Sequence, residues 1–260
     1  MDLILQHINR YAYARNLPTT LIDPSGLLYS CVDVNYAQNV LQRYLNDNLS
    51  VPKDTLCWAT QVFYGAVAET LDIFGFTLAP TGLKKWLSNT GGILEVPFSS
   101  LESVSDVQKC IEFGYEQVEK AIRGLENQGK LCCNGKPQIF DRELPGGCEI
   151  NQPSPWKWDA QQDLFLTVGG KIDNVWVHGI INPQKTSYSV EIHFEFRDNY
   201  IFQSPQKVVP GVYACTPPPL PPILFIIPDL LGMKLQEVGC ASSFWISSFG
   251  TKTKNYPCNR

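Results

Sequence analysis

One segment of the chain concentrates side chains that can move protons. In SVEIHFEFRDNYIF (residues 189–202), polar and apolar residues alternate, which predicts a β-strand with one polar and one apolar face. The polar face carries two carboxylates, an imidazole and a guanidinium, from Glu191, His193, Glu195 and Arg197. Such a face could perform acid–base chemistry if it lines a cleft. The alternative is a solvated strand face with cross-strand ion pairs.

A second candidate is a cysteine at the start of an expected helix, in LCWATQVFYG (residues 56–65). The helix dipole favours a thiolate at Cys57. The Cys-Trp-Ala stretch resembles papain-like cysteine hydrolases, and this resemblance implies a downstream histidine oriented by Asn or Asp. His178 would be that histidine, with Asp198 or Asn199 as its orienting group. The glutamine that this family carries shortly before the cysteine is absent, and the alternative is a buried structural cysteine.

The elements that position these residues differ between the two halves of the chain. Helical periodicity and end signals predict helices early in the chain, at residues 35–49, 54–75, 79–92 and 100–130. Later segments alternate with period two and predict strands, at residues 163–170, 174–182, 187–202 and 207–215, followed by a short helix and a last strand within 227–250. We therefore expect an α+β fold, with a helical N-terminal half and an antiparallel, β-rich C-terminal half.

Composition argues against two function classes, nucleic-acid-binding proteins and proteins with a membrane-spanning helix. The 260 residues have a net charge of −4, and the 21 Lys and Arg are scattered. No clear nucleic-acid-binding stripe is visible, although a small nuclease could use a local patch. No segment has the roughly 18 consecutive apolar residues of a membrane-spanning helix.

The chain contains nine cysteines but only three histidines. No CxxC pair is present, so the sequence predicts neither a metal site nor a cofactor. In an oxidising compartment the cysteines could form disulfides, whereas in a reducing cytosol they would be small buried hydrophobic residues.

A specific family resemblance lies near the start of the chain, in INRYAYARNLPTTLIDPSGL (residues 8–27). It resembles the end of the repeat core of Rhs (YD-repeat) proteins, where a Tyr-x-Tyr-x-x-Asn-x-Pro stretch precedes a closing Asp-Pro-x-Gly-Leu. The matching positions are Tyr11, Tyr13, Asn16, Pro18, Ile22, Asp23, Pro24, Gly26 and Leu27. The segment departs from the family at Leu17, where a second Asn is usual.

The resemblance implies both a domain organisation and a function. Rhs repeats form a closed β-shell, and the chain is cut after the Asp-Pro-x-Gly-Leu motif, here after Leu27 with Asp23 participating. Residues 1–27 would be the remnant of the core, and residues 28–260 a toxin carried by the shell and neutralised by an immunity protein. We divide the toxin into a helical part (28–131), a loop-rich linker (132–162) and a β-rich part (163–260). Such effectors serve interbacterial competition, including type VI secretion, and reach the target cell without a classical signal peptide.

Three classes of toxin remain open on the sequence. The leading hypothesis is an enzyme, a hydrolase built either on Cys57 and His178 or on His193 and its neighbours. The second is a membrane-active toxin that inserts residues 62–79. The third is a non-enzymatic binding module.

Overall fold

The computed structural model describes residues 31–47, 51–131, 135–153, 159–201, 208–213 and 223–258. The cleavage motif expected at Asp23, Pro24, Gly26 and Leu27 lies outside the described residues. The chain divides into two compact units. Unit 1 comprises residues 1–91 and 201–243, and unit 2 comprises residues 92–200 and 244–260.

The described part of unit 1 is mainly helical. Its elements are α3 (Cys31–Asp47), α4 (Lys53–Ile73), α5 (Leu78–Leu87), the hairpin strands β7 (Val208–Tyr213) and β8 (Ile223–Pro228), and α9 (Asp229–Glu237). Tyr64 of α4 and Trp86 of α5 are fully buried, with ring centroids 4.9 Å apart. A disulfide joins Cys57 of α4 to Cys240. No helix in the described ranges is both long and apolar enough to cross a membrane, including those within the 62–79 segment.

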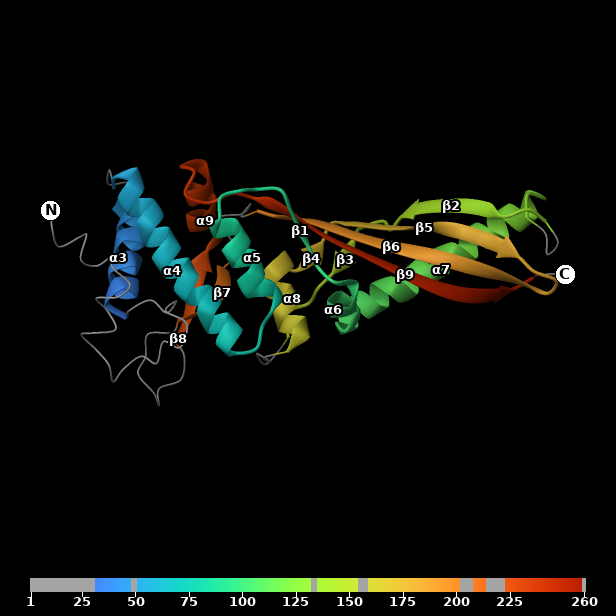
Figure 1. Ribbon diagram of the computed structural model, residues 1–260, viewed down its shortest axis with the longest axis horizontal. Coiled ribbons are helices and arrows are strands. Elements are labelled where there is room, and N and C mark those ends of the chain that lie inside the picture. Colours follow the sequence, from blue (N-terminus) through green and yellow to red (C-terminus); the bar gives the residue numbers. More distant parts are fainter. Residues whose placement is uncertain are drawn as a thin grey trace. The chain divides into compact units, whose positions relative to one another are not determined.

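Unit 2 is built around one sheet and the helix α7, which runs along the long strands (Figure 1). Its helices are α6 (Phe98–Glu102), α7 (Ser105–Asn127) and α8 (Ala160–Val168). Its strands are β1 (Ile93–Glu95), β2 (Gln138–Glu143), β3 (Cys148–Glu149), β4 (Lys171–Ile172), β5 (Asn174–Pro183), β6 (Ser187–Tyr200) and β9 (Phe244–Pro257). The α+β class expected from the sequence is confirmed, with helices mostly in the N-terminal half.

The main sheet of unit 2 has the strand order β1-β9-β6-β5-β2. All neighbouring strands are antiparallel except β1 and β9, which are parallel. Strand β2 lies within residues 132–162, which the sequence indicated as a loop-rich linker, and it pairs with β5 along its whole length. Because β2 is short, bounded by turn residues and without polar/apolar alternation, it could not be distinguished from the surrounding loop signals.

The single helix expected over residues 100–130 is two helices, α6 and α7, and the strand expected at residues 163–170 is not formed. Residues 163–170, expected as a strand, belong largely to helix α8. The Asp159 side chain caps this helix by accepting a hydrogen bond from Gln162 N, and Gly169 ends it with a left-handed φ of 67°. These two end signals favour a helix over the two-residue period of the short apolar run between them.

The first turn of α7 is held by a buried carboxylate. Asp106 accepts hydrogen bonds from Asn151 N (2.8 Å), Asn151 Nδ2 (3.1 Å) and Gln161 Nε2 (2.7 Å), and pairs with Lys109. Burial alone would raise the pKa of Asp106, but these hydrogen bonds outweigh that effect and lower the pKa to about 2. The carboxylate therefore joins α7 to the segments before and within α8, and the Cys110–Cys148 disulfide adds a covalent link from α7 to β3.

The helix-covered face of the sheet is closely packed at Gly250 of β9. A Cβ at this position would overlap the ring of Phe98 in α6, well inside van der Waals contact. We expect Gly250→Ala to lower the free energy of unfolding by about 1–3 kcal/mol, because the half-buried Phe98 ring must move. The matched control is Gly124→Ala in α7, where a Cβ meets nothing within 4 Å. That change should stabilise the helix by about 1 kcal/mol. Thermal unfolding of both variants checks the pair, and equal effects would contradict the packing at Gly250.

Candidate functional site

Cys57 is not available as a nucleophile in this structure. Its Sγ is bonded to Cys240 Sγ, and a disulfide sulfur has no thiolate to attack a substrate. Cys57 belongs to unit 1 and His178 to unit 2. Because its sulfur is held in the disulfide, Cys57 lacks the free thiolate that a cysteine hydrolase requires.

The sheet of unit 2 has a face that lies opposite the side occupied by buried apolar residues, which we call the open face. On β6, every second residue from Tyr188 to Tyr200 is buried, and the intervening residues are exposed or half-buried. Glu191, His193, Glu195 and Arg197 are among those intervening residues. The polar face expected from the sequence is thus the open face. The β6 register with β5 and β9 decides which side chains join it.

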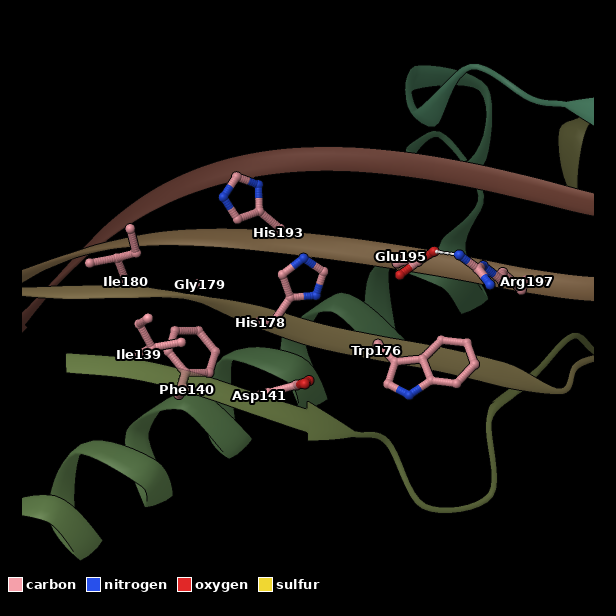
Figure 2. A pocket seen from close by; sticks show the side chains of 10 residues that line it. All are labelled: Ile139, Phe140, Asp141, Trp176, His178, Gly179, Ile180, His193, Glu195 and Arg197. Atoms are coloured by element: carbon pink, nitrogen blue, oxygen red, sulfur yellow. Dashed lines mark ion pairs between the residues drawn. The ribbon is translucent and has the colours of Figure 1, made fainter.

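Two histidines meet on the open face. His178 of β5 is directly opposite His193 of β6 in the antiparallel register. Their rings are stacked, with centroids 5.5 Å apart (Figure 2). The ring of Phe249 from β9 contacts both, with its centroid 5.5 Å from that of His193 and 6.3 Å from that of His178. The two imidazoles therefore lie side by side on adjacent strands, although 15 residues separate them in the chain.

Both ring nitrogens of His193 have partners. The Nε2 atom is 2.9 Å from Glu191 Oε1, and the Nδ1 atom is 3.0 Å from Thr251 Oγ1. An ionised carboxylate only accepts hydrogen bonds, so Nε2 must carry the proton when His193 is neutral. Nδ1 is then the acceptor, and Thr251 Oγ1 donates its proton to it. This gives a hydrogen-bonded chain of hydroxyl, imidazole and carboxylate.

The site lies beside a shallow hollow of about 510 Å³ over strands β2, β5 and β6. The hollow is lined by the two histidines, Trp176, Asp141, Glu195 and Arg197, together with apolar residues of β2 and β5. Glu195 and Arg197 form an ion pair (Figure 2), and the Arg197 guanidinium lies 5.8 Å from the centre of the Trp176 ring. Asp141 of β2 is directly opposite His178 in the register.

Asp198 does not belong to this site. It is buried, 5% exposed, and lies on the other face of β6 from His193 because the two are an odd number of residues apart. Five positions of strand separate them, about 16 Å. Burial is the main reason that the pKa of Asp198 rises to about 7. Asn199 is on the open face, but it is opposite Trp245, not beside His178. Neither residue orients a histidine as the sequence suggested.

Some members of the site were not identified from the sequence. Thr251, Phe249, Trp176 and Asp141 come from β9, β5 and β2, and only the strand register brings them to the histidines. The alternation of β5 and β9 could have placed their outward-facing residues. No sequence signal specified which of these residues would lie opposite His193.

No cluster of three or more His, Cys, Asp and Glu side chains within the described ranges could hold a metal ion. The comparisons with protein-family models, curated proteins and solved structures gave no match. The chemistry of the site therefore has to be inferred from its own geometry. That geometry is a stacked pair of histidines, one of which also contacts a carboxylate and a hydroxyl.

Proposed function

We propose that the chain is the C-terminal toxin of an Rhs-type effector and that the open face of unit 2 carries a hydrolase site. The Rhs part of the proposal rests on the Tyr/Asn/Pro stretch and the Asp-Pro-x-Gly-Leu motif of residues 8–27. The hydrolase part rests on one observation, the chain of contacts from Thr251 through His193 to Glu191 beside His178. Its expected partners are an Rhs shell and a cognate immunity protein.

The roles of the residues follow from their contacts. The Thr251 hydroxyl attacks the acyl or phosphoryl centre of the substrate, and its proton passes to His193 Nδ1. Glu191 stabilises the imidazolium that forms, because its carboxylate accepts the Nε2 proton in a hydrogen bond. His178 protonates the leaving group. Water then hydrolyses the Thr251 ester, and its proton returns His178 to the acid form while His193 restores the Thr251 hydroxyl.

The test is growth of bacteria that express residues 28–260, once in the cytosol and once exported to the periplasm. The Cys57–Cys240 and Cys110–Cys148 disulfides favour killing by the exported form, because disulfides persist in an oxidising compartment. Loss of one acid–base group slows a reaction by about 10²–10⁴-fold. We therefore expect His178→Ala, His193→Ala and Glu191→Gln to relieve killing.

Two threonines on the same face of β9 provide a matched pair of variants. Thr251→Val removes the hydroxyl that contacts His193, whereas Thr253→Val removes a hydroxyl two positions further along the strand. We expect Thr251→Val to relieve killing, and Thr251→Ser and Thr253→Val to retain it. Killing that survives both His178→Ala and His193→Ala would reject the hydrolase site. Absence of killing by the wild type in both compartments would reject the toxin assignment.

A further inference from the structure

Strand β9 is much longer than the strand that pairs with its outer edge. Its 14 residues, Phe244–Pro257, all pair with β6 on one side. On the other side β1 pairs only with residues 245–247. Among the residues that the structure describes, no strand pairs with the outer edge from 249 to 255, which we call the free edge.

The backbone direction of the free edge follows from the β1 contacts. Trp245 N donates to Gly92 O, and Ser247 O accepts from Val96 N, so the backbone groups of residues 245 and 247 point outward. Since this direction alternates along a strand, Phe249, Thr251, Thr253 and Asn255 also point their N–H and C=O groups outward. All four residues are exposed. They form the template to which an added strand hydrogen-bonds.

The charged side chains of the free edge indicate which kind of strand can pair with it. Its only charged side chains are Lys252, which pairs with Glu102, and Lys254, which lies 4.3 Å from the centre of the Tyr115 ring. A second copy of the chain, paired antiparallel about Thr253, would place Lys252 opposite Lys254 twice. Like charges directly opposite each other destabilise a strand pair, so the lysines disfavour self-pairing and favour an acidic strand.

We propose that the free edge of β9 binds an extended, acidic segment of the partner that neutralises this protein, by addition of a strand to the sheet. The inhibitory role rests on the proposed function, whereas the docking itself does not. The added strand would run beside Phe249 and Thr251. Its open-face side chains would therefore lie next to the Thr251 hydroxyl and the Phe249 ring, both of which contact His193. Binding at the edge would in this way cover the Thr251 side of the site.

The test uses the full chain and a fluorescently labelled nine-residue peptide that alternates threonine and glutamate. The same peptide with lysine in place of glutamate is the charge control. Thr253→Pro removes one outward N–H without removing a hydrogen bond to β6, and Thr253→Val keeps that N–H. We expect the acidic peptide to bind the wild type and Thr253→Val equally, and to slow amide exchange in residues 249–255. Loss of one hydrogen bond should weaken binding to Thr253→Pro by about tenfold.

Lys254→Glu provides a second variant should proline disturb the strand, which circular dichroism will reveal. It should weaken binding of the acidic peptide and strengthen binding of the lysine peptide. Equal binding of the two peptides to the wild type, or no protection of residues 249–255, would overturn the docking site. If toxicity is unchanged by His178→Ala and His193→Ala while the peptide still slows amide exchange in residues 249–255, only the hydrolase proposal is rejected. If His193→Ala abolishes toxicity but the peptide does not slow amide exchange in residues 249–255 of the wild type, only the docking proposal is rejected.

Discussion

Cys57→Ala and Cys240→Ala should destabilise the protein equally, by up to about 5 kcal/mol in the free energy of unfolding at 25 °C. The two cysteines are bonded to each other and are 183 residues apart in the chain. A cross-link over so long a loop removes much conformational freedom from the unfolded chain, and the loop-entropy relation gives this value. The measurement is denaturant unfolding followed by circular dichroism, under non-reducing conditions.

The pair of variants also separates a structural from a catalytic role of Cys57. A disulfide role predicts the same loss of stability and of killing for both single variants. The double variant Cys57→Ala/Cys240→Ala should then be no worse than either one. A nucleophilic role predicts that only Cys57→Ala abolishes killing. If Cys57→Ala is as stable as the wild type but no longer kills, Cys57 has a catalytic role.

Asp198→Asn should remove a pH dependence of stability that the wild-type protein shows between about pH 4 and 7. Burial raises the pKa of Asp198 from 3.8 to about 7, so the folded protein binds its proton more tightly than the unfolded chain does. The stabilisation is fully present below about pH 4 and is lost as the pH rises towards 7. About three pKa units correspond to about 4 kcal/mol.

Chemical denaturation at pH 4 and at pH 8 measures this effect. Asp198→Asn should resemble the wild type at pH 4 and be more stable than it at pH 8, because asparagine carries no charge to bury. Asp141→Asn, at an exposed position of the same sheet, is the matched control. It should change the stability by less than about 0.5 kcal/mol at either pH. A wild-type protein that gains stability from pH 4 to pH 8 relative to Asp198→Asn would contradict the buried carboxyl.

Local patterns in the sequence were sufficient to predict most helices and strands and those residues of the site that lie on β6. The alternation in residues 189–202 placed Glu191, His193, Glu195 and Arg197 together on one face of β6, because successive side chains of any strand point to opposite sides. The same rule separates Asp198 from His193, since the two positions are five apart along the strand, an odd number. The helices of the N-terminal half likewise follow from periodicity and end signals.

Tertiary structure alone decided the rest. Strand register set His178 and Thr251 opposite His193, and a shift of one residue would have turned either side chain to the helix-covered face. Tertiary structure also decided the role of Cys57, because its disulfide partner Cys240 lies 183 residues away in the chain. A thiol at the start of a helix looks the same in the sequence whether it is a nucleophile or half of a disulfide. The physical reason is that sequence periodicity reports only on neighbours within one element, whereas register and disulfide pairing depend on how distant elements pack.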